Sequence, residues 1–187
     1  IQTACIAAGG ITSPNPPFNG MTNSEIYDGT NWTNGPTLST GRYGNAAAGT
    51  STAGVVFGGY GNPVPGSQVA QTEEFDGSSY SESGDLATGR HYLGGTGTQT
   101  AAIAVGGSQP PPTSALVENY DGSSWTAGTN IPTATSNIRA SGTQTLNLAF
   151  AGYNTALSVK TYAYDGTSWT AKPDMSTARQ EGGNSTQ

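Results

Sequence analysis

The sequence is poor in charged residues and contains one histidine and one cysteine, and each scarcity excludes a class of function. Charged residues make up 10% of the 187, and the six Lys and Arg residues are scattered in a chain of formal net charge −6. No basic stripe for nucleic acid is present. Cys5 can form no intrachain disulfide, and a lone histidine cannot build a zinc site, nor a Ser-His-Asp triad without far more support from other residues. No apolar run reaches the roughly 18 residues of a membrane span.

Glycine and the aromatic residues are abundant instead. The chain has 28 glycines, 11 prolines, nine tyrosines and three tryptophans. Aromatic residues that recur at fixed spacing argue against disorder, so the composition indicates a turn-rich all-β protein. Low charge with many Thr, Ser, Gly and Asn residues is typical of secreted and virion surface proteins. The chain begins IQTAC, without methionine or a signal peptide, which predicts a processed or excised piece.

One motif occurs four times, which predicts a repeat architecture. Its copies are EIYDGTNW (25–32), EEFDGSSY (73–80), ENYDGSSW (118–125) and YAYDGTSW (162–169). The repeats are therefore centred on Asp28, Asp76, Asp121 and Asp165. Fourteen residues after each aspartate come Arg42, Arg90, Thr135 and Arg179. A glycine pair or its variant follows at constant spacing, as Gly58-Gly59, Gly106-Gly107 and Ala151-Gly152.

The fourth repeat is divided between the two ends of the chain. Residues 179–187 supply its first part and residues 1–10 its second, with nearly unbroken phase across the join. We therefore predict one domain over 1–187, made of four whole, circularly permuted repeats. Pairing of the N-terminal strand with the C-terminal strand would close such a chain into a ring.

Each repeat is predicted to form four short antiparallel strands. Strand a follows the arginine, as in YGNAAAG, and strand b is apolar, as in AGVVFGG. Strand c precedes the aspartate, and strand d carries a tryptophan, or Tyr80 in the second repeat. The Asp-Gly between strands c and d is a strong hairpin signal because glycine accepts φ > 0. Four strands in roughly 47 residues are typical of a propeller blade.

The combination of Gly-Gly after strand b, then Tyr-Asp, Trp and Arg resembles the Kelch motif over the whole chain. The sequence pattern YDGTSW…GTQTA…GG is also similar to tandem Kelch-like repeats of marine phage and environmental bacterial proteins. This resemblance implies an all-β propeller with four four-stranded blades. Small residues in strand a suit a narrow ring of that size, and a monomer is favoured over a ring shared by two chains.

The variable segments lie in the predicted b–c loops, at residues 10–24, 60–71, 108–117 and 153–161. In an up-and-down blade the b–c and d–a connections emerge on the same side. Length variation confined to one face of a repeat protein often marks its binding face. We therefore place the candidate site on this face.

Seven residues are candidates for that site. They are Arg42, Tyr43, Tyr60, Arg90, His91, Tyr153 and Arg179. The arginines could grip a carboxylate, a phosphate or a sugar hydroxyl, or could instead bond loop carbonyls and brace the blade. Tyr43 and His91 could stack on a ligand or serve an ordinary strand role. The four aspartates are explained by turn chemistry and lack the ligands of a calcium site.

The sequence predicts a non-enzymatic module that binds a glycan or a protein through this face. We expect no catalytic residues, no metal and no cofactor, and an extracellular or virion-associated location. A purely architectural spacer is the alternative. A hydrolase is a third reading, although Glu73, Glu74, Asp85 and Glu181 form no evident catalytic pair.

Overall fold

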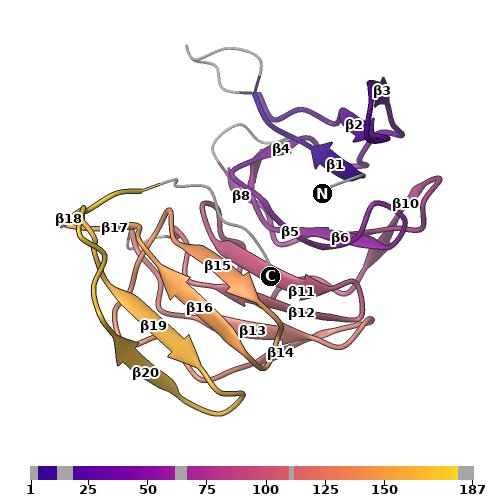
Figure 1. The fold of residues 1–187 in the computed structure, drawn as a ribbon. Helices are drawn as coiled ribbons and strands as arrows, with labels where there is room; N and C mark the ends of the chain where they lie inside the picture. The colour runs from indigo at the N-terminus through magenta and orange to yellow at the C-terminus, as the bar shows by residue number, and fades with distance from the viewer. Residues whose placement is uncertain (1–3, 12–18, 62–66, 110–111, 181–187) are drawn as a thin grey trace.

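The computed structural model describes residues 4–11, 19–61, 67–109 and 112–180. These residues form antiparallel sheets and contain no helix, so none is present that is long and apolar enough to cross a membrane. Four sheets follow one another in chain order, from the indigo strands at the top of Figure 1 to the yellow-orange strands at the lower left. The all-β prediction is confirmed.

Each of the four sheets corresponds to one repeat. The first sheet contains β1 (Cys5–Ala8), β2 (Ser24–Tyr27) and β3 (Trp32–Asn34). The second contains β5 (Ala46–Gly49), β6 (Gly54–Phe57), β9 (Thr72–Phe75) and β10 (Tyr80–Ser83). The third contains β11 (Gly94–Thr98), β12 (Ala101–Val105), β13 (Val117–Tyr120) and β14 (Trp125–Ala127). The fourth contains β15 (Arg139–Gly142), β16 (Asn147–Phe150), β19 (Thr161–Tyr164) and β20 (Trp169–Lys172).

In the second, third and fourth sheets the four predicted strands occur where the repeat places them, and their registers agree between sheets. The first sheet has three strands within the described residues. Gly54 pairs with Phe75 in the second sheet and Asn147 with Tyr164 in the fourth, at equivalent repeat positions. The hairpin between strands c and d turns at Asp-Gly, and Gly77 adopts φ 98°. A side chain there would be strained because that backbone conformation favours glycine. The repeat in the sequence is therefore a structural repeat.

Two small ladders in the connections were not predicted. One contains β4 (Arg42–Tyr43), β7 (Tyr60–Gly61) and β8 (Ser67–Gln68), and the other contains β17 (Tyr153–Asn154) and β18 (Ala156–Leu157). These strands are two residues long, too short to show an alternating pattern in the sequence. In the first ladder, β4 at the start of the predicted strand a pairs with β7 of the following b–c segment. The second ladder lies within a single b–c segment that was predicted as a loop.

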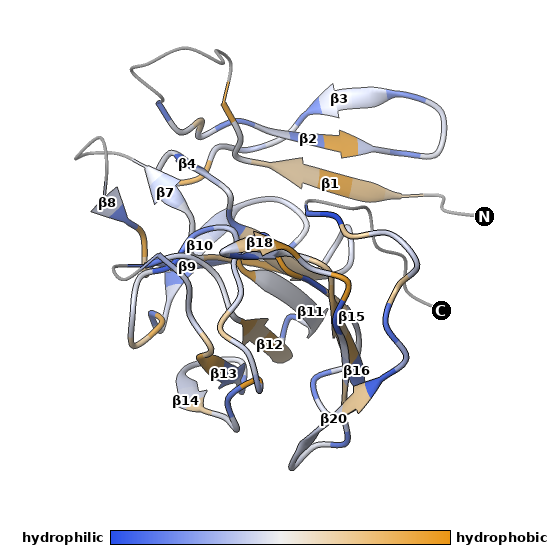
Figure 2. Ribbon diagram, turned by 90° about the vertical axis from the view of Figure 1, so that its left-hand side faces the viewer, coloured by the Kyte–Doolittle hydropathy of each residue, from blue (hydrophilic) through white to orange (hydrophobic). Residues whose placement is uncertain are grey.

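Neighbouring sheets pack face to face through apolar side chains. Val55 and Phe57 of the second sheet share a buried cluster with Tyr120 and Trp125 of the third. The ring centroids of Phe57 and Trp125 are 4.7 Å apart, and the indole Nε1 donates to Thr72 Oγ1 over 2.9 Å. Aromatic burial of this kind is the largest apolar contribution a small β protein can make. Figure 2 shows the apolar colour on central strands such as β12 and polar colour on many connections.

The closed ring predicted from the sequence is not seen within the described residues. The four sheets form an arc, with the first and fourth sheets at its ends (Figure 1). Most of the predicted closing strand, residues 181–187, lies outside the described residues. Trp32 of β3 is 51% exposed, since among the described residues no sheet covers that side of the first sheet.

Lowering the pH from about 4 to about 2 is expected to destabilise the protein through the hairpin aspartates. Asp121 Oδ1 accepts the backbone N–H groups of Ser123 and Ser124, and these bonds lower its pKa from 3.8 to about 2. Asp76 behaves in the same way. A carboxylate whose pKa is lower in the folded state than in the unfolded state stabilises the folded protein at pH values above its ordinary pKa. This stabilisation is lost as the pH falls through the folded-state pKa. Denaturant titrations across this range would measure the slope.

An Asp121→Asn variant is the matched control for this pH dependence. Asparagine can accept the same two backbone N–H bonds but does not titrate. The variant should therefore show a shallower loss of unfolding free energy between pH 4 and pH 2. An unchanged slope in Asp121→Asn would contradict the assignment.

Candidate functional site

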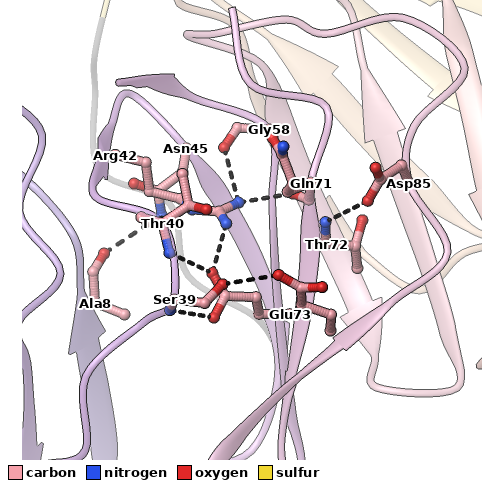
Figure 3. Close-up of polar contacts among 11 residues, drawn as sticks. Ala8, Ser39, Thr40, Arg42, Asn45, Gly58, Gln71, Thr72, Glu73 and Asp85 are labelled. Carbon is pink, nitrogen blue, oxygen red and sulfur yellow. Dashed lines mark hydrogen bonds and ion pairs between the residues drawn. The ribbon is translucent and has the colours of Figure 1, made fainter. Parts of the chain in front are cut away.

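Arg42, the first candidate, is buried inside an interface between sheets. Its guanidinium is 0% exposed, and Nη2 lies 2.6 Å from Oε1 of Glu73 (Figure 3). Nη1 donates to the carbonyl oxygens of Gly58 at 3.2 Å and Gln71 at 2.6 Å. The other carboxylate oxygen accepts the backbone N–H of Ser39 over 2.7 Å. Burial lowers the pKa of Arg42 from its ordinary value, and the Glu73 carboxylate opposes that shift.

Arg90 makes the same contacts one repeat later. Nη2 lies 2.7 Å from Glu118 Oε1, and Nη1 donates to Gly106 and Leu116 at 2.8 Å each. Ala87 donates its backbone N–H to Glu118 Oε2 over 2.8 Å. Both arginines thus join the end of one repeat to strands b and c of the next, which is the bracing geometry.

Arg179 differs from the other two arginines. Its side chain is exposed, and within the described part of the chain it forms no ion pair. Its Nε donates to Thr177 O over 3.4 Å, as Arg42 Nε donates to Thr40 O over 3.2 Å. The local conformation is shared, and only the far partner differs.

The d–a connections and the b–c segments lie on the same face, because they pair with each other in successive repeats. Arg42 pairs with Gly61, His91 with Ser108, and Ser136 with Tyr153. We call this side of the molecule the loop face. It carries the remaining candidates Tyr43, Tyr60, His91 and Tyr153.

Four rings form a closed cluster on the loop face, and Tyr92 is a member that sequence reasoning missed. The centroids of Tyr43 and Tyr60 are 5.4 Å apart, and those of Tyr60 and His91 are 4.7 Å apart. The ring of Tyr92 lies 4.7 Å from His91 and 6.4 Å from Tyr43. Burial raises the pKa of Tyr43 and lowers that of His91, so the imidazole is neutral at pH 7.

Two rings of this cluster, His91 and Tyr92, line a cavity of roughly 460 Å³, which we call the loop-face cavity. Its volume falls within the usual range for small-ligand sites. Its lining comes from the third and fourth repeats and from the connections around them. The lining residues are His91, Tyr92, Ser108, Pro112, Thr113, Ser136, Asn137, Tyr153, Asn154 and Thr155. None of them is acidic, lysine or arginine.

Backbone strain is concentrated around this cavity. In the described residues, four residues other than glycine have positive φ, and three of them line it: Tyr92 at 54°, Asn137 at 51° and Thr155 at 48°. A bulky or β-branched residue in this region costs about 1–3 kcal/mol, and such residues cluster at functional sites. The surrounding fold therefore holds Tyr92 and Thr155 in an unfavourable backbone conformation beside the cavity, whereas asparagine at position 137 accepts that conformation more easily.

Two buried polar atoms beside the cavity have no hydrogen-bond partner among the described residues. They are Nδ1 of His91 and Oδ1 of Asn137. An unsatisfied buried donor or acceptor costs about 1–3 kcal/mol, and most native ones have a partner in the protein, in water or in a ligand. Nδ1 of His91 can donate when it carries the hydrogen, and Oδ1 of Asn137 can only accept.

The repeat contains a signal that identifies Tyr92 and Asn137. Both lie two residues after the arginine or its substitute, where the first repeat has Gly44 at φ 61°. A glycine at one copy of a position indicates that left-handed backbone is required there, so tyrosine at another copy is costly. Tyr92 also donates its backbone N–H to Gly44 O over 2.7 Å.

No protein-family model and no curated protein matches the chain. Among the described residues, no group of three or more His, Cys, Asp or Glu side chains is placed to hold a metal ion.

Proposed function

We propose that the protein is a non-enzymatic binding module that takes a neutral glycan into the loop-face cavity. The observation that carries this proposal is the gathering of Tyr92, Asn137 and Thr155, all at positive φ, around one cavity. Strain that the fold sustains at a single cavity is expected where side chains are pre-positioned for a ligand. The location we propose for such a module is a phage particle or a secreted surface protein.

The chemistry of the lining favours a sugar over an ionic ligand. The lining has aromatic rings, hydroxyl groups and amides, and it has no charged side chain. A pyranose ring has an apolar C–H face that packs on an aromatic ring and hydroxyls that bond amide and imidazole groups. Tyr92 and Tyr153 supply the rings, and Thr113 and Asn154 are among the residues that supply a hydroxyl and an amide.

Replacing Tyr92 by asparagine is expected to weaken binding about tenfold or more while leaving the fold intact. The chain itself has Asn137 at the equivalent position in the same backbone conformation, so the variant keeps the turn and loses only the ring. Loss of one aromatic anchor commonly costs 2 kcal/mol or more at a binding site. A neutral oligosaccharide array, followed by calorimetry with the best binder, measures the change.

A Thr52→Ala variant is the matched control for the array. Thr52 is exposed in the turn between β5 and β6, at the opposite end of the sheets from the loop face. Its binding should equal that of the wild type. A wild-type protein that is silent on the array, or a Tyr92→Asn variant that binds as well as the wild type, would overturn the proposal. Binding to host-envelope protein alone would favour the protein-ligand alternative.

We also propose that the four sheets are the blades of a single Kelch-like propeller closed within one chain. Support comes from a cavity of roughly 340 Å³ on the loop face whose lining includes residues next to each of the four sheets. Gly10 and Ile11 follow β1 of the first sheet, Tyr43 and Tyr92 lie in the next two connections, and Arg139 belongs to β15. The ends of the arc thus border a common space, as in a small ring.

A further inference from the structure

We infer that the uncovered faces of the fourth and first sheets form a fourth inter-sheet seam, in which Arg179 binds Glu25. The inference rests on the proposed four-sheet ring and assigns the side chains that hold it. Its basis is a contact set that recurs inside the chain. The arginine at the end of one repeat binds the glutamate three residues before the next aspartate, as in Arg42–Glu73 and Arg90–Glu118.

The third interface shows that the two partners occur as a unit. There the arginine is replaced by Thr135, and the glutamate of the next repeat is replaced by Tyr162. Tyr162 OH lies 2.9 Å from Thr133 Oγ1 in place of the ion pair. A buried carboxylate without its arginine would be an uncompensated charge, so loss of one partner requires loss of the other.

The two ends of the arc have kept both partners. Arg179 lies at the arginine position of the fourth repeat, and Glu25 lies at the glutamate position of the first. Both are exposed, and among the described residues neither forms an ion pair, whereas the side chains of Arg42 and Glu73 are 0% and 1% exposed. A pair without a structural role could have been replaced, as the arginine and glutamate of the third interface have been.

The acceptors for Arg179 are already arranged in the first sheet. The counterparts of Gly58 and Gln71, whose carbonyls bind Arg42, are Gly9 and Asn23. Gly9 donates its N–H to Asn23 O over 2.9 Å, as Gly58 donates to Gln71 O over 3.2 Å. The carbonyl pair therefore has the same local bonding before any guanidinium reaches it.

Apolar side chains on the two uncovered faces also match those that are buried at the other interfaces. Leu148 of β16 is 43% exposed, whereas Val55 and Ile103 at the same repeat position are fully buried by the following sheet. Trp32 of β3 is 51% exposed, whereas the equivalent Trp125 is 9% exposed. By the same register, Trp32 would donate to Thr161 as Trp125 does to Thr72. The fourth sheet thus exposes Leu148, and the first sheet exposes Trp32, the apolar side chain that would pack on that face.

The occupant of each uncovered face is the other end of the same chain. Residues next to the first and fourth sheets already border one cavity, so the two faces lie around a common space. Closure within the chain also costs less association entropy than pairing with a second copy. A head-to-tail dimer is the competing arrangement.

A double-mutant cycle on Arg179→Ala and Glu25→Ala tests the seam. We expect the pair to change the unfolding equilibrium constant by a coupling factor of about tenfold or more, as contacting residues do. Arg42 and Glu73 provide the buried reference pair. The exposed pair Lys160–Asp174, 2.9 Å apart with side chains 56% and 41% exposed, is the matched control, for which about fivefold is the upper bound.

Measuring the solution mass together with the double-mutant cycle distinguishes the possible outcomes. A monomer of 18.9 kDa with strong coupling supports the seam. Strong coupling with a doubled mass overturns closure within one chain, and coupling no larger than that of Lys160–Asp174 overturns the seam itself. Glycan binding by an uncoupled protein would leave the proposed function standing, so the two failures are distinguishable.

Trp32 provides a readout that needs no unfolding. The fluorescence of Trp32, obtained by subtracting a Trp32→Phe variant from the wild type, should be shielded from acrylamide several-fold relative to free indole. Arg179→Ala should increase that quenching. Quenching of wild-type Trp32 as strong as that of free indole would contradict the seam, even if the alanine variants fail to fold.

Discussion

Replacing Arg90 by threonine is expected to lower the free energy of unfolding by about 3–5 kcal/mol. The variant leaves Glu118, which is 5% exposed in its side chain, as a buried carboxylate without its cation. It also removes the hydrogen bonds from Nη1 to the carbonyls of Gly106 and Leu116. Urea unfolding at neutral pH, followed by circular dichroism, measures the change.

The third interface suggests a rescue for this loss. A double variant, Arg90→Thr with Glu118→Tyr, reproduces the pair Thr135 and Tyr162 that the chain uses one repeat later. Thr88, the counterpart of Thr133, is present to accept the tyrosine hydroxyl. The double variant should recover a substantial part of the stability. If it is no more stable than the sum of the single changes, the two residues do not act as a unit.

Replacing Trp125 by alanine is expected to cost about 3–5 kcal/mol, the usual range for a buried large aromatic. The indole is 9% exposed and packs on Phe57 of the second sheet and on Tyr120 of its own hairpin, with centroids 4.7 and 4.9 Å away. Its removal leaves a cavity at the interface between two sheets. Thermal and denaturant unfolding would both show the loss.

Two further variants divide the contribution of Trp125. Trp125→Phe keeps most of the ring packing and removes the Nε1 bond to Thr72, so about 1–2 kcal/mol should be lost. Thr126→Ala changes an exposed side chain on the same strand and should stay within about 0.5 kcal/mol of the wild type. A Trp125→Ala variant as stable as Thr126→Ala would show that the sheets do not pack through this residue.

Strand positions were predictable because the repeat is nearly invariant where backbone geometry demands particular residues. The Asp-Gly turn sets each hairpin, since Asp121 bonds two backbone N–H groups and Gly122 takes φ 95°. Residues that follow at constant spacing then pair in the same register in every sheet. The short ladders of β4 and β17 were missed because two-residue strands carry no period.

The candidate site was predictable only in outline. Its face followed from strand order, and His91 and Tyr153 do line the loop-face cavity. The roles of Arg42 and Arg90 depended on which carboxylate each meets, and their partners lie 31 and 28 residues away in the next sheet. An arginine at a fixed spacing is equally consistent with a ligand contact and with a brace.

The sequence alone determined the four repeats, their strands and their turns, because those features depend on local backbone geometry and on alternation along single strands. Only the tertiary structure decided which side chains are buried, which are strained and which lack a partner, since these depend on contacts between different sheets. Tyr92 illustrates the division. Its position in the repeat was evident, but its strained backbone and its place beside His91 and Asn137 arise from how the third and fourth repeats pack.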